Sequence, residues 1–180
     1  ADVSYPSIPL FLRYQPRLVF GMMRPLIRYA ASDAWPFDFA PHDAGQFPLL
    51  NGQVYSSGTD PQDQMPVEEC GNMLLMTAAA TAASGDMSFV NESWELLTTW
   101  AGYLRQHGLD PENQLCTDDF AGHLAHNCNL SIKAILGVAA YGRLLHRRGE
   151  EAEGERWIEA ARSMAREWVE KAGNGDGTYR

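Results

Sequence analysis

The sequence has few basic side chains. Its 180 residues carry 14 Lys and Arg against 23 Asp and Glu, which gives a formal net charge of -9. Nucleic-acid and anionic-membrane surfaces require clustered Lys and Arg, so the charge balance argues against both kinds of partner. No apolar run approaches the length that crosses a bilayer, so membrane insertion is not expected. A neutral or cationic small-molecule substrate fits this composition better.

The first residues also lack features of a complete secreted precursor. There is no initiator Met, and the basic and apolar regions of a signal peptide are missing. We therefore expect residues 1–180 to be a single, incomplete domain excised from a larger protein. The three cysteines, Cys70, Cys116 and Cys128, form no Cys-x-x-Cys pair. Their odd number leaves at least one thiol free or paired with another chain.

The charge pattern predicts helices of two kinds. Apolar residues on one face and charges on the other predict outward helices at about 16–32, 88–107 and 151–172, with Ser88 as a possible cap. Two further helices, at about 66–84 and 129–147, are nearly free of charge. A helix that is apolar all round is buried all round. The prolines in residues 1–14 predict an extended segment.

These helices alternate outer, inner, outer, inner, outer, so the fold class we predict is all-α, built from consecutive αα hairpins. Long loops precede both inner helices, at residues 33–65 and 108–127. In a ring of such hairpins these loops converge on one face, where they would surround a cavity. Two inner helices are too few to close a ring, and their apolar flanks would stay exposed. We expect further chain, or another copy, to cover them.

Three blocks of sequence resemble the glutaminase A family. They are residues 41–48 (Pro-His-Asp-Ala-Gly-Gln-Phe-Pro), residues 65–73 (Met-Pro-Val-Glu-Glu-Cys-Gly-Asn-Met) and residues 110–127, which contain Cys-Thr-Asp-Asp-Phe-Ala-Gly-His. The resemblance implies a six-hairpin, glycosidase-like (α/α)6 toroid. It also implies a hydrolase that converts glutamine to glutamate and ammonia, in an extracellular or periplasmic location.

Four carboxylates are the candidate catalytic residues. Glu68 and Glu69 lie in the first turn of one inner helix, and Asp118 and Asp119 lie in the loop before the other. Either pair could consist of ordinary helix-start or loop acids. Brought to one cavity, however, two carboxylates can divide the roles of acid and base. We take Asp119 and Glu69 as the principal pair, with Asp118 and Glu68 as alternates.

Polar residues of the two loops are the candidate substrate contacts. They are His42, Asp43, Gln53, His123, His126 and Asn127. The histidines and Asp43 could in principle bind a metal, but His-x-x-His without a third ligand at fixed spacing is a weak signal. We expect hydrogen bonding instead, with no metal and no cofactor. Aromatic residues of the first loop could stack on a sugar, although pinning the loop is the commoner role.

Three functions stay open on these residues. The first is the glutaminase-type hydrolase, whose substrate comes entirely from the resemblance. The second is a glycoside hydrolase, which paired carboxylates and aromatic loops suit directly. The third is a non-catalytic fragment or binding module that lacks part of the site.

Overall fold

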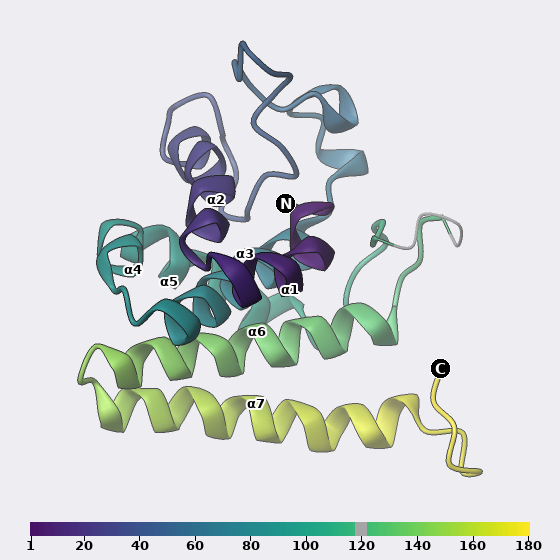
Figure 1. The fold of residues 1–180 in the computed structure, drawn as a ribbon. Coiled ribbons are helices and arrows are strands. Elements are labelled where there is room, and N and C mark those ends of the chain that lie inside the picture. Colours follow the sequence, from purple (N-terminus) through teal and green to yellow (C-terminus); the bar gives the residue numbers. More distant parts are fainter. Residues whose placement is uncertain (118–121) are drawn as a thin grey trace.

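The computed structural model describes residues 1–117 and 122–180, and in this part the regular secondary structure consists of helices joined by loops (Figure 1). In this part, extended pairing is limited to two isolated bridges, Gln114 with Leu124 and Gly173 with Tyr179. The helices are α1 (Ser4–Tyr14), α2 (Arg17–Ala30), α3 (Pro66–Ser84), α4 (Ser88–Glu92), α5 (Trp94–His107), α6 (Cys128–Arg147) and α7 (Glu151–Ala172). Two short 3-10 turns, Tyr55–Ser57 and Pro61–Asp63, lie in the loop before α3.

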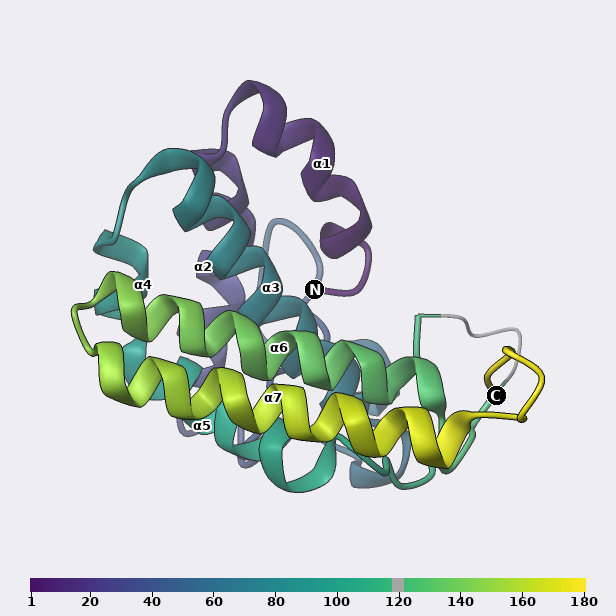
Figure 2. The same ribbon diagram turned by 90° about the horizontal axis from the view of Figure 1, so that it is seen from below.

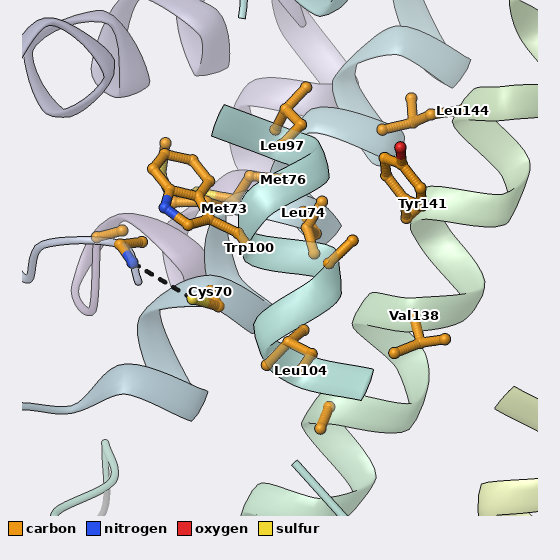
Figure 3. Close-up of a cluster of buried hydrophobic side chains, with 14 of the residues drawn as sticks. Cys70, Met73, Leu74, Met76, Leu97, Trp100, Leu104, Val138, Tyr141 and Leu144 are labelled. Atoms are coloured by element: carbon orange, nitrogen blue, oxygen red, sulfur yellow. Dashed lines mark hydrogen bonds between the residues drawn. The ribbon is translucent and has the colours of Figure 1, made fainter. Parts of the chain in front are cut away.

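The predicted division into inner and outer helices is confirmed. Most residues of α3 and about half of α6 are buried, whereas α7 buries five residues along one face. Helix α6 contacts α3, α5 and α7, and it runs antiparallel to α7 in both views (Figures 1 and 2). Figure 3 shows part of this core, where Trp100 of α5 lies beside Met73 of α3 and the α6 side chains Val138 and Leu144 lie across α5 from them.

The extended segment predicted for residues 1–14 is wrong, because Ser4–Tyr14 forms α1. Pro6 lies in the first turn, where backbone N–H groups have no partner within the helix. Pro9 lies inside the helix at an exposed position and has no N–H to donate to the carbonyl of residue 5. Helix α1 contacts α2 and α3, and Ile8 is its one buried residue.

The helix predicted at 88–107 is interrupted. Ser93, with φ -108° and ψ 10°, separates α4 from α5. The expected cap at Ser88 is also wrong, because Ser88 is the first residue of α4 and both its N–H and its hydroxyl donate to Asp86 Oδ1. The hairpins are therefore α1 with α2, α3 with α4 and α5, and α6 with α7. None of the helices in the described ranges is long and apolar enough to cross a membrane.

Candidate active site

The two glutamates of the first α3 turn are both buried. Glu68 is 1% exposed and Glu69 is fully enclosed. Pro66 occupies the first position of the helix, and the side-chain oxygen of Gln114 accepts a hydrogen bond from Val67 N at 3.0 Å. The start of α3 is thereby tied to the loop before α6. Carboxylates in this position are favoured by the helix dipole, but their burial requires partners.

Glu68 has its partners on other elements. Its Oε1 accepts hydrogen bonds from Lys133 Nζ of α6 and, at 2.6 Å, from the Thr117 hydroxyl. The same hydroxyl lies 2.5 Å from Asp2 Oδ1. A hydroxyl has one proton to donate, so the two carboxylates share one donor at this point. Residues 2, 68, 117 and 133 thus form one polar cluster.

Glu69 is joined to the cluster through Asn72, one turn further along α3. Asn72 Nδ2 donates to Glu69 Oε2 at 3.3 Å, and Lys133 Nζ donates to Asn72 Oδ1 at 2.9 Å. The nitrogen of Ala1 lies 3.2 Å from Glu69 Oε2. Among the described residues, Glu69 Oε1 has no hydrogen-bond partner. Burial raises the pKa of Glu69, which favours its protonated form.

His42 extends the cluster on the side of the first long loop. Its Nε2 lies 3.8 Å from Asp2 Oδ2, and its Nδ1 lies 3.1 Å from Asp43 Oδ2. The ring stacks on Tyr55 with a centroid distance of 4.1 Å. Burial alone would lower the pKa of His42, but the carboxylates of Asp2 and Asp43 outweigh it and raise the pKa to about 9. His42 is therefore a cation at neutral pH.

Asp43 and Gln53 organise the loop itself. Asp43 accepts hydrogen bonds from the backbone N–H groups of residues 45, 54 and 55. Burial would raise its pKa, but His42 and these N–H groups lower it well below the usual range. Gln53 accepts from His42 N at 2.7 Å and donates to two backbone carbonyls and to Gln64 Oε1. Both side chains are occupied in shaping the loop, and direct substrate contact stays a prediction.

The other predicted residues lie at the second loop. Asp118 and Asp119 fall outside the described residues. His123 lies 3.4 Å from Asp63, and exposed His126 pairs with Asp110 at 2.7 Å. Asn127 caps α6, because its Oδ1 accepts from the N–H groups of Asn129 and Leu130. The structure thus brings Glu68, Glu69, His42 and Asp43 together and gives Asn127 a role in the helix start.

Sequence reasoning missed Lys133, Asp2 and Asn72 as members of the cluster. A signal was present for Lys133, the lone charged residue between Asn127 and Arg143 in a helix expected to be buried. Such a residue needs a buried partner of opposite charge. Asp2 gave no comparable signal, since it lies in a segment expected to be extended. Asn72 is one polar residue among several in α3.

Metal-ligand geometry is not found in the described ranges: no group of three or more His, Cys, Asp or Glu side chains could hold an ion there. The cluster uses its histidine and carboxylates for hydrogen bonds and ion pairs. A hollow of about 620 Å³ lies elsewhere, along the C-terminal halves of α3 and α6, and is lined by Leu75, Ala78, Ala79, Ala82, Arg143, Leu144, His146 and Arg147. It contains none of the clustered acids.

Alternating inner and outer helices, with buried carboxylates where the inner helices begin, define a helical-hairpin domain of the toroid class. The chain belongs to the family of the glutaminase A six helical-hairpin domain, whose model matches residues 1–180. It is 32% identical over 168 residues to glutaminase A of Aspergillus oryzae, covering 93% of this chain and 24% of that protein. It is 29% identical over 235 residues to a probable glutaminase of Arthroderma benhamiae, covering 99% of this chain and 27% of that protein.

The chain therefore spans about a quarter of the length of these curated relatives. No solved structure matches it.

Proposed function

We propose that this domain supplies part of the active site of a hydrolase that releases ammonia from the side-chain amide of glutamine. The substrate is suggested by the names of the two relatives, glutaminase A and a probable glutaminase. The observation that carries the proposal is the polar cluster around Glu68 and Glu69, which joins Asp2, just before α1, to α3, α6 and both long loops.

Hydrolysis of an amide needs one group that accepts a proton from the attacking water and another that protonates the leaving nitrogen. Glu68 is ion-paired with Lys133, so it is the candidate base. Glu69, whose pKa is raised by burial, is the candidate acid. Asp119 and Asp118 remain proposed site residues alongside them. His42 and Lys133 are the cations that could stabilise negative charge on the reacting carbonyl oxygen.

Access to the cluster is through its partly exposed members. The side chains of Asp2, His42 and Lys133 are 16%, 21% and 14% exposed, whereas Glu69 lies under Ala1. A ligand in this conformation would therefore meet Asp2, His42 and Lys133 first. Reaction at Glu69 requires that residues 1 and 2 shift.

Glycoside hydrolysis is the second candidate, and the paired glutamates favour it. The aromatic residues of the first loop give it less support. Trp35, Phe37 and Phe39 stack on one another with centroid distances of 4.8 to 5.7 Å, and Trp35 is 5% exposed. They pin the loop to the helices instead of forming an open platform for a sugar ring.

The direct test is to assay the full-length chain for ammonia release from L-glutamine, with L-asparagine as a matched shorter amide and a panel of aryl glycosides in parallel. Turnover of glutamine well above both comparisons supports the proposal. Turnover of glycosides alone would replace it with the second candidate. Absence of turnover on every substrate would favour a non-catalytic binding role.

A further inference from the structure

Lys133 crosses from α6 to the acids of α3. Its side chain is 14% exposed, and its ammonium contacts Glu68 Oε1, lies 2.9 Å from Asn72 Oδ1 and sits 4.4 Å from the centroid of the Tyr5 ring. These three contacts come from α3 and α1. One side chain of α6 therefore connects the N-terminal parts of α1, α3 and α6.

Gly71 leaves the space through which Lys133 passes. A Cβ at position 71 would lie 3.0 Å from Lys133 Cδ and 2.5 Å from Lys133 Cγ, and the shorter distance is closer than real Cβ atoms approach their neighbours. Glycine in the interior of a helix is destabilising relative to alanine. Its presence in a buried turn of α3 is explained by the close approach of the lysine side chain.

The contacts of Glu68 are uneven between its two oxygens. Lys133 and Thr117 both donate to Oε1, whereas among the described residues none donates to Oε2. Anchoring by Oε1 orients the carboxylate and leaves Oε2 without a donor among the described residues. This is the arrangement that a general base requires. Because the Glu68 side chain is 1% exposed, a proton reaches Oε2 only when a substrate or water enters the cluster.

We propose that Lys133 is a positioning residue of the active site, which passes beside Gly71 and holds Glu68 by Oε1 so that Oε2 can act as the base. The inference rests on the proposed hydrolase function. It adds a residue pair, Gly71 and Lys133, whose joint role is to orient a third residue. We expect substitution of either Gly71 or Lys133 to lower turnover, because alanine at position 71 displaces the lysine side chain without removing its charge.

The test compares Gly71→Ala, Lys133→Met and Lys133→Ala in the full-length chain, with the double variant Gly71→Ala/Lys133→Ala. Gly102→Ala is the matched glycine control, since a Cβ there meets nothing within 4 Å. Arg143→Met is the control for loss of a cation from α6. Each variant is assayed well below its unfolding midpoint, and its unfolding free energy is measured in urea.

We expect Gly71→Ala and Lys133→Met to lower kcat by about tenfold or more while KM changes by less than about threefold. In the Lys133→Ala background, Gly71→Ala should have little further effect on kcat or on stability, because the atoms it would meet are gone. Both controls should keep kcat within about twofold of the wild type.

Unchanged kcat in Gly71→Ala and Lys133→Met would make Lys133 a structural tie and overturn the positioning role. Additive effects of Gly71→Ala and Lys133→Ala on unfolding would also overturn the inference. A wild-type chain that turns over neither glutamine nor glycosides contradicts the proposed function. The positioning role then fails with it, and the unfolding measurements still decide whether Gly71 accommodates Lys133.

Discussion

At the scale of single residues, His42 couples the stability of the cluster to pH. Its pKa rises from 6.5 to about 9 in the folded chain because Asp2 and Asp43 outweigh the effect of burial. A raised pKa stabilises the fold in full below pH 6.5, and this contribution is lost as the pH rises through about 9. Because the His42 side chain is partly exposed, we expect this contribution to the free energy of unfolding to be roughly 1 to 2 kcal/mol.

The measurement is urea unfolding of the wild type and His42→Gln between pH 6 and pH 10. The difference in unfolding free energy should be largest at pH 6 and should shrink across this range. His126→Gln, at an exposed histidine, is the control. A difference that is constant with pH would show that protonation of His42 does not stabilise the folded chain.

Residue-level reasoning from the sequence found the acids but not their partners. Glu68 and Glu69 were identifiable because they precede a long uncharged stretch. Lys133 could have been paired with them, since a lone buried cation needs a carboxylate. Asp2 could not, because its place beside His42 depends on where residues 1–3 lie in three dimensions.

At the scale of elements, Asn127 tests the start of α6. Its side chain satisfies two N–H groups that have no partner within the helix. We expect Asn127→Ala to lower the free energy of unfolding by about 1 kcal/mol and Asn127→Asp to retain most of the cap. Ser88→Ala should have a smaller effect, because the Ser88 hydroxyl donates to Asp86 and accepts from no N–H group of α4. Equal losses at the two positions in urea titrations would contradict this.

The inner helices could be predicted because buried helices contain few charged residues, and this pattern spans most of the length of α3 and α6. Helix α1 could not, because a proline rule that holds in a helix interior is relaxed in the first turn and at an exposed position. The break at Ser93 gave no local signal in an amphipathic stretch. The charge pattern of the sequence therefore predicted which segments form inner helices. It did not predict α1 or the break at Ser93, which depend on solvent exposure and on contacts with neighbouring helices.

At the scale of the whole molecule, the 180-residue chain leaves apolar surface exposed on α1 and on its inner helices α3 and α6. Leu136 of α6 is 50% exposed, Leu10 of α1 is 60% exposed, and the hollow beside Leu75 and Ala79 is open. Such faces are covered by partners in stable proteins. We predict that this chain, studied alone, associates with further copies and binds a dye specific for apolar surfaces.

Sedimentation velocity over a range of concentrations checks this prediction. Association should increase with concentration, and Leu136→Lys should reduce both association and dye binding. Val169→Lys, at an equally exposed apolar residue on the outer helix α7, is the matched control. A monodisperse monomer without dye binding would show that the exposed apolar surface of this chain does not require a partner.

The central claim is that the acids at the start of α3 carry out the chemistry. The most direct measurement is kcat/KM of the full-length chain for glutamine in Glu68→Gln, Glu69→Gln and the double variant, with exposed Glu92→Gln as control. We predict that each single variant loses at least about a hundredfold, and that the double variant loses far less than the product, because the two acids act as one unit. Single variants that keep kcat/KM within about threefold of the wild type, with the fold intact, would contradict the account.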